Sequence, residues 1–124
     1  MKSSSISNFV KVIALVLMLD SVYLSIMSSS YERLVASIQG SRLRLNYTAA
    51  AMCYLLLSFM ISRFVVESDS GLMDSFLLGF CTYGIFDLTS MAIFSKWTLD
   101  LALVDMVWGG ILYMLVGYLI RAFV

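Results

Sequence analysis

Three aspartates stand inside long apolar stretches of the sequence, where acidic side chains are rare. Asp20 lies in the first such stretch, Asp87 in the third and Asp105 in the fourth. A carboxylate at the centre of a bilayer costs a few kcal/mol, so these residues are expected to face a bundle interior or a watery cavity. A buried carboxyl group in such a place is suited to general acid–base chemistry.

The three aspartates are also predicted to lie at similar depth. Asp20 and Asp87 each lie eight residues before the end of their stretch, at Ser28 and Ser95, whereas Asp105 lies near the start of its own. At 1.5 Å per residue, the first two are about 12 Å from one membrane surface and the third is about 7 Å from that same surface. All three are therefore expected in one leaflet.

Each aspartate has polar or aromatic companions at helical spacing, three or four residues away. We predict a polar intramembrane pocket whose candidate residues are Asp20, Tyr23, Tyr83, Asp87, Thr89, Ser90, Asp105 and Trp108. Basic residues on the same side are predicted to cap this pocket as head-group contacts, namely Arg33, Arg42 and Arg44.

Three interpretations of this cluster stay open. The aspartates could be structural, each joining helices through hydrogen bonds worth about 0.6 to 2 kcal/mol. They could form a site that handles a small molecule, a lipid head group or a proton. They could instead hold a hard cation, although the acidic residues lack the close spacing of a dedicated ion loop.

Composition identifies the elements that must position these residues. Of the 124 residues, 61% are hydrophobic and only 13% are charged, which excludes a disordered chain or an ordinary soluble domain. A transmembrane helix needs about 20 apolar residues. Four stretches qualify, and we predict a single all-α membrane domain, an antiparallel bundle of four helices over residues 9–27, 47–66, 72–94 and 101–123.

The connections between the stretches differ in length. A tight polar turn over residues 67–71 predicts that the second and third helices form a hairpin, and the short segment 95–100 pairs the third with the fourth. The first connection is long, and residues 31–38 have apolar side chains at i, i+3, i+4 and i+7. We therefore expect a short interfacial amphipathic helix there, ended by Gly40.

Several function classes are excluded or not indicated. With eight basic and eight acidic residues and no His, the chain has zero net charge, no basic run for nucleic acid and no imidazole for catalysis or metal binding. We predict no cofactor and no metal. Cys53 and Cys81 lie inside helices, and we expect them to be inert packing residues without a disulfide.

The orientation is only weakly indicated, because four basic residues fall on each side of the predicted bundle. Lys2 and Lys11 flank the first helix, which usually dominates, and they favour cytoplasmic termini in the cell (inner) membrane. The first stretch has a second interpretation as a signal peptide, although Asp20 interrupts its apolar run.

The sequence resembles the bacterial membrane family catalogued as domain of unknown function 2177. The resemblance rests on three runs, Asp20-Ser21-Val22-Tyr23-Leu24, Phe86-Asp87-Leu88-Thr89-Ser90 followed by Trp97, and Asp105-Met106-Val107-Trp108-Gly109. Two positions depart from the family pattern, Ser90 in place of Asn and Thr98 in place of Pro. The resemblance implies four short membrane helices and a recurring set of intramembrane acids, but no established activity.

The functional prediction is therefore a multi-pass membrane protein with a polar pocket that binds or acts on a lipid or small amphiphile. Two alternatives remain, a small proton-coupled transporter and a non-catalytic structural membrane subunit. The expected partners are the lipid bilayer and that amphiphile, with a homo-oligomer or a membrane complex left open. No enzyme class is indicated.

Overall fold

The computed structural model describes residues 3–123, so Lys2 lies outside the described residues. Within them the chain forms helices alone, and four spans are long and apolar enough to cross a membrane. The predicted all-α membrane bundle is confirmed. Its elements are α1 (Ser3–Gln39), α2 (Tyr47–Ile61), the π-helical turn η1 (Ser62–Val66) that continues α2, α3 (Leu72–Ile93) and α4 (Leu99–Phe123).

The first helix is much longer than predicted. α1 has 37 residues and is about 55 Å long, against a hydrocarbon core of about 30 Å. Residues 31–38 are helical, but they continue α1 and do not form a separate helix. The reason is that α1 contains no Gly or Pro, and its serines bond back to the helix, as Ser25 Oγ does to the Ser21 carbonyl at 2.7 Å. Gly40, with φ of +75°, ends the helix as predicted.

The closest helix pair is α3 with α4, in agreement with the short connection between them. Small residues permit this approach. A Cβ atom on Gly79 would lie 2.1 Å from the Gly109 carbonyl oxygen, and one on Gly84 would lie 2.9 Å from the Met106 methyl group. Ser75 and Gly79 are both buried, so α4 packs on a face of α3 that consists of small residues.

The predicted hairpin of α2 with α3 is wrong. The turn at residues 67–71 is tight, but α2 packs on α1 and has few close approaches to α3, while α1 also packs on α4. The physical reason is that the small-residue face of α3 already accommodates α4. The core lies where α1, α2, η1 and α4 meet, and its largest fully buried apolar residues are Val12, Val16, Ile61, Val65, Leu112, Tyr113 and Val116.

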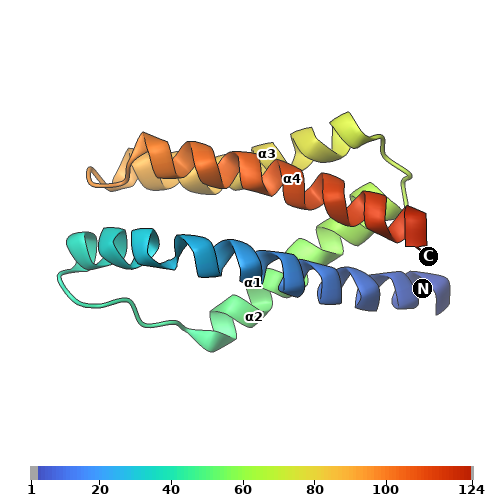
Figure 1. Cartoon of the computed structure of the whole chain (residues 1–124), viewed down its shortest axis with the longest axis horizontal. Helices are drawn as coiled ribbons and strands as arrows, with labels where there is room; N and C mark the ends of the chain where they lie inside the picture. Colours follow the sequence, from blue (N-terminus) through green and yellow to red (C-terminus); the bar gives the residue numbers. More distant parts are fainter. Residues whose placement is uncertain (1–2, 124) are drawn as a thin grey trace.

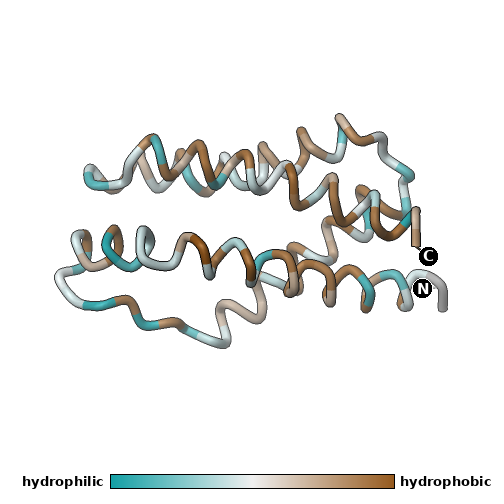
Figure 2. The backbone as a smooth tube through the Cα atoms, viewed as in Figure 1, coloured by the Kyte–Doolittle hydropathy of each residue, from teal (hydrophilic) through white to brown (hydrophobic). Residues whose placement is uncertain are grey.

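Polar contacts hold the two ends of the bundle. At the end where α1 begins and α4 finishes (Figure 1), Arg121 pairs with Asp69 at 3.2 Å and Ser5 Oγ donates to Glu67 at 2.9 Å. At the opposite end, Lys96 Nζ donates to the Ser37 carbonyl at 2.8 Å. Figure 2 shows hydrophobic residues along the middle of the helices and hydrophilic ones near the turns, as a membrane protein requires.

The segment after Gly40 determines where the site can form. Residues 41–46 have no helical structure, and Figure 1 shows them running back along the molecule before α2 begins. Asn46 then caps α2, because its side chain accepts a hydrogen bond from the Ala49 amide at 3.1 Å. We call residues 41–46 the strap. In the half of the bundle near the strap, this extended segment therefore lies where a fourth helix would otherwise lie.

Candidate functional site

Asp20 joins three helices. Its side chain is buried, and it accepts a hydrogen bond from Trp108 Nε1 on α4 at 2.9 Å and another from the Tyr54 hydroxyl on α2. A typical hydrogen bond of this kind contributes about 1 kcal/mol to stability. Asp20 therefore faces the bundle interior as predicted, and its two donors come from different helices.

Asp105 lies on α4 and is held by side chains of α1. The Tyr23 hydroxyl donates to Asp105 Oδ1 at 3.0 Å and lies 2.8 Å from the Tyr31 hydroxyl. The Tyr23 ring is stacked on the Trp108 indole, with centroids 4.9 Å apart. Because Trp108 donates to Asp20, this stacked pair connects the surroundings of the two aspartates.

Asp87 differs from the other two aspartates. It is fully buried on α3, and neither of its carboxyl oxygens has a hydrogen-bond partner among the described residues. Its carboxyl group lies beside that of Asp105 and beside the Trp97 indole, whose Nε1 is also buried and unpartnered. An acceptor and a donor thus lie close together without satisfying each other, although buried polar groups are normally hydrogen-bonded.

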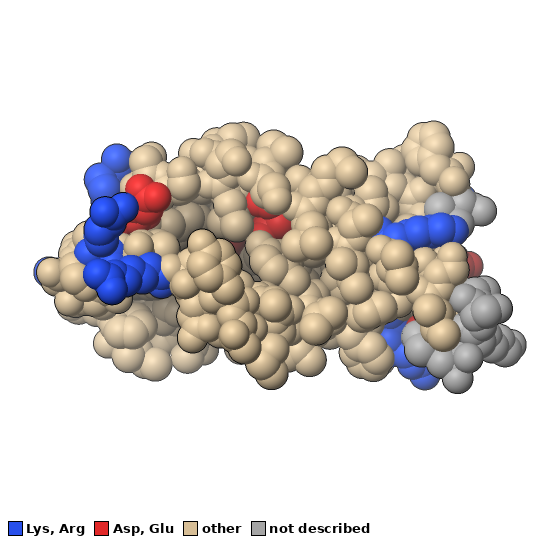
Figure 3. Space-filling model, turned by 90° about the horizontal axis from the view of Figure 1, so that it is seen from below, with Lys and Arg blue, Asp and Glu red and all other residues tan. Residues whose placement is uncertain are grey.

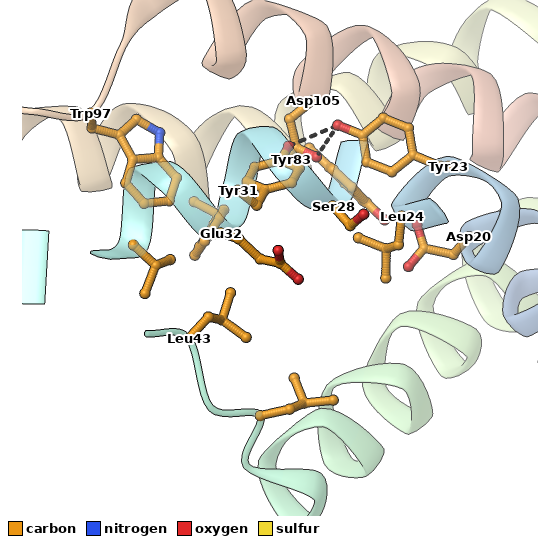
Figure 4. A pocket seen from close by; sticks show the side chains of 13 residues that line it. Asp20, Tyr23, Leu24, Ser28, Tyr31, Glu32, Leu43, Tyr83, Trp97 and Asp105 are labelled. Carbon is orange, nitrogen blue, oxygen red and sulfur yellow. Dashed lines mark hydrogen bonds between the residues drawn. The ribbon is translucent and has the colours of Figure 1, made fainter. Parts of the chain in front are cut away.

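A cavity of about 430 Å³ adjoins these residues. Figure 4 shows side chains from α1, the strap, α3 and α4 around it, with Asp105, Tyr23 and Tyr31 linked by hydrogen bonds. Its size is typical of small-molecule pockets. The cavity is lined by Asp20, Tyr23, Leu24, Ser28, Tyr31, Glu32, Val35, Leu43, Leu45, Tyr83, Phe86, Trp97 and Asp105.

Local sequence explains why α3 and α4 can place these groups. A Cβ atom on Gly109 would lie 2.3 Å from the Tyr83 ring, so this glycine lets the Tyr83 side chain lie flat against α4. Asp105 stands one helical turn before Gly109, and Asp87 one turn after Tyr83. The close contact of the two helices therefore brings the two carboxyl groups together.

The predicted site residues do not all reach the cavity. Asp20, Tyr23, Tyr83 and Asp105 line it, while Asp87 and Trp108 lie next to residues that do. Ser90 is buried, but its hydroxyl bonds the Phe86 carbonyl at 2.8 Å within α3. Thr89 is exposed on the outer surface of α3 and does not line the cavity.

The three arginines predicted to cap the pocket lie to one side of it. Arg33 and Arg42 line an adjoining hollow that shares Glu32 and Leu43 with the cavity, and Arg44 lines neither. On the face shown in Figure 3, Lys and Arg gather near the two ends of the molecule, and acidic atoms are visible near its middle in a hollow between uncharged residues. The basic groups therefore border the site and do not cover it.

Sequence reasoning missed several residues of the site. Among them, Tyr54, Tyr31, Trp97 and Glu32 all contact or line it, and none of the four was predicted as a site residue. A usable signal existed for Tyr31, which follows Tyr23 by eight residues and so lies on the same helical face. Tyr54 had none, because α2 is apolar on all sides.

Other chemistry is less supported by the arrangement. Within residues 3–123, no group of three or more acidic or cysteine side chains is placed to hold a metal ion. Cys53 and Cys81 are free thiols, and both are exposed on the outer surface, so the expectation that they pack inside the bundle is wrong. Other residues form the buried faces of these helices, namely Leu57, Ser58 and Ile61 on α2 and Ser75, Gly79, Gly84, Asp87 and Ser90 on α3.

Four apolar spans that enclose buried carboxyl groups define this chain as an integral membrane protein. The model of the family described as predicted membrane protein (DUF2177) matches residues 5–121, and the chain belongs to this family. The resemblance noted from the sequence is therefore confirmed. Comparison with curated proteins and with solved structures gives no match.

Proposed function

We propose that the cavity binds a lipid or a small amphiphile taken from the membrane. The observation that carries this proposal is the mixed lining of the cavity, in which the carboxyl groups of Asp20 and Asp105 face the apolar side chains of Leu24, Leu43 and Leu45. A molecule with one polar end and an apolar body matches such a lining, because each part meets its own kind of surface.

The position of the strap supports the same proposal. Leu43 and Leu45 line the cavity from a segment without helical hydrogen bonds, so they can move without breaking a helix. The core residues of α1, α2 and α4 lie elsewhere and need not change. Movement of the strap is thus the least costly way for an amphiphile to enter from the surrounding bilayer.

Detection of a bound amphiphile in the purified protein tests the proposal. We expect wild-type protein, purified in a mild detergent, to carry a co-purified amphiphile visible by native mass spectrometry. Leu43→Trp, which places an indole in the cavity, should lose it. The matched control is Leu55→Trp, since Leu55 is exposed on α2 and does not line the cavity. Equal retention by both variants, or no bound amphiphile in the wild type, would contradict the proposal.

A cellular experiment tests whether the bound molecule is also handled. The lipids of a deletion strain should differ from those of the parent and be restored by wild type but not by Asp105→Asn. Restoration should be normal with Asp74→Asn, whose carboxylate is exposed at the far end of α3. A lipid profile that deletion leaves unchanged would count against action on a lipid.

A structural role is the second candidate, and the hydrogen bonds of Asp20 favour it. These bonds connect α1 with α2 and α4, as a purely structural residue would. Asp87 separates the two functions, because it has no hydrogen bond to lose among the described residues. If Asp87→Asn alters amphiphile binding but not the unfolding temperature, the site has a function beyond holding the helices together.

We further propose that the protein lies in the cell membrane with both termini in the cytoplasm. Lys11 supports this orientation, since it lies near the start of the first span, which usually sets the topology. At the opposite end, the exposed arginines Arg33, Arg42 and Arg44 would then face outward.

A further inference from the structure

The cavity is acidic and has no basic residue in its lining. Asp20, Glu32 and Asp105 line it, and the carboxyl group of Asp87 lies beside that of Asp105. Among the described residues, none of these four carboxyl groups has a Lys or Arg within salt-bridge distance. Asp20, Asp87 and Asp105 are buried, and buried charged groups are normally paired and hydrogen-bonded. The site therefore has no basic side chain of its own to pair with these carboxyl groups.

The unpartnered groups point to the same deficit. Asp87 is fully buried, its two oxygens have no hydrogen bond within residues 3–123, and its neighbours Asp105 and Trp97 both line the cavity. The other two aspartates receive hydrogen bonds from tyrosine or tryptophan. Asp87 is thus the carboxyl group whose environment is incomplete, and it lies against the wall of the cavity.

Aromatic rings make up much of the rest of the lining. Five line the cavity, belonging to Tyr23, Tyr31, Tyr83, Phe86 and Trp97. Aromatic faces attract organic cations, most strongly when the cation is desolvated, and such rings recognise quaternary ammonium groups. Hydrated metal ions need a compact set of oxygen ligands instead, which the lining does not supply.

The nearby arginines make the two sides of the cavity differ in charge. Arg33 and Arg42 line the adjoining hollow, so a cation is repelled from that side and attracted by Asp20 and Asp105 on the other. The apolar side chains of Leu24 and Leu45 are available to an attached hydrocarbon group. Carboxyl groups, aromatic rings and apolar side chains in one cavity match an organic ammonium ion with an apolar body.

We propose that the amphiphile bound by this cavity carries a positively charged nitrogen, as an alkylammonium does. This inference rests on the proposed function, and it narrows the ligand from any amphiphile to a cationic one. The ammonium group lies against Asp105 and Asp20, with the aromatic rings around it. The alkyl chain extends past the strap toward the lipid.

Three probes with the same decyl chain test the inference on the full-length protein in dodecyl maltoside micelles. They are decyltrimethylammonium, decyl sulfate and decyl maltoside, which share the alkyl chain and have a cationic, an anionic and a neutral polar head group. Intrinsic fluorescence reports binding, because Trp97 lines the cavity and Trp108 stacks on Tyr23, and the sequence has two tryptophans. Half-saturation is expressed as the mole fraction of probe in the micelle. The distribution of the probe between water and micelle then cancels when variants are compared.

We expect a saturable change with decyltrimethylammonium at a mole fraction at least tenfold lower than with either other probe. Asp105→Asn should weaken binding of the ammonium probe at least tenfold, and Asp74→Asn should leave it unchanged. Glu32 is exposed on the surface of α1, so Glu32→Gln removes a carboxylate of the cavity lining without breaking a buried hydrogen bond. This variant should weaken binding of the ammonium probe about threefold.

The outcomes separate the two proposals. Equal saturable binding of the three probes, or no effect of Asp105→Asn and Glu32→Gln on the ammonium probe, would overturn the cationic preference and leave amphiphile binding intact. Tighter binding of decyl sulfate would also overturn it and would assign the contact to Arg33 and Arg42. If no probe binds saturably and no amphiphile co-purifies, the proposed function itself fails.

Discussion

The ring of Tyr23 on α1 lies parallel to the indole of Trp108 on α4, with an interplanar angle of 3°. Each member of this stack donates a hydrogen bond to a different aspartate, Tyr23 to Asp105 and Trp108 to Asp20. The donor on α1 thus serves the acid on α4, and the donor on α4 serves the acid on α1. This reciprocal arrangement fixes both aspartates through one aromatic contact. A stacked aromatic pair contributes about 1 kcal/mol of stability beyond the burial of its surface.

The Tyr23 hydroxyl should therefore matter more than an average tyrosine hydroxyl. Tyr23→Phe keeps the stack but loses the bonds to Asp105 and Tyr31, and we expect it to lower the free energy of unfolding by about 2 kcal/mol. Tyr31→Phe removes one of these bonds and should cost about 1 kcal/mol. Reversible unfolding in mixed detergent micelles measures both changes.

The control is Tyr118→Phe, because Tyr118 is exposed on α4. It should change the free energy of unfolding by less than about 0.5 kcal/mol. Equal effects of Tyr23→Phe and Tyr118→Phe would show that the bond from Tyr23 to Asp105 contributes nothing to stability.

Close packing of α3 on α4 gives a second prediction. Gly109→Ala would place a methyl group 2.3 Å from the Tyr83 ring, so Tyr83 must leave its position or the two helices must separate. We expect a loss of about 3 kcal/mol or more, and weaker amphiphile binding because Tyr83 lines the cavity. Thermal unfolding and the decyl probes measure the two effects.

Gly71→Ala is the matched control, since a Cβ atom at Gly71 meets nothing within 4 Å and φ there is negative. This variant should unfold at the same temperature as the wild type. A stable, fully binding Gly109→Ala protein would contradict the packing of Tyr83 against α4.

The exposure of the two cysteines gives a third prediction. Cys53 and Cys81 lie on the outer surface of helices that span the membrane, so lipid should cover them. In intact membranes we expect labelling by a membrane-permeant maleimide and little by a charged, impermeant one.

Leu43→Cys in a variant without the two native cysteines should react with the impermeant reagent, and an alkylammonium ligand should slow that reaction.

Rapid reaction of Cys53 with the impermeant reagent in sealed membranes would place the middle of α2 in water. That result would contradict the assignment of α2 as a membrane span.

The orientation gives a fourth prediction. With both termini in the cytoplasm, green fluorescent protein fused after Val124 should be fluorescent, and a periplasmic alkaline phosphatase fused there should be inactive. The same phosphatase inserted between Ser41 and Arg42, in the strap, should be active. The opposite pattern would invert the topology and leave the fold unchanged.

Hydropathy and spacing predicted most of the fold. The spans of α2 together with η1, of α3 and of α4 agree with the apolar stretches to within about two residues, since length and apolar content determine a membrane helix. The extent of α1 was missed, because a polar sequence with a helical pattern does not show whether the helix continues through Ser28, Ser29 and Ser30. The pairing of α2 was missed because turn length does not reveal which face of α3 is already occupied.

The candidate site was predictable in part for the same reason. Rare acids in apolar helices must turn inward, so Asp20, Asp87 and Asp105 could be found from the sequence, and all three are buried. Their donors could not be assigned, because the hydrogen bond from Tyr54 depends on the packing of α2 against α1. Thr89 was included by sequence proximity alone, and its position on the helix turns it outward.

The strap, finally, separates the architecture of this protein from its selectivity. The six residues 41–46 contribute Leu43 and Leu45 to the cavity without taking part in any helix. Insertions, deletions or exchanges in such a segment are tolerated far better than changes in a packed helix. A library varied only at residues 41–45, with the cap residue Asn46 kept, would therefore redesign what the cavity accepts while the four helices, and the acids they carry, stay as they are.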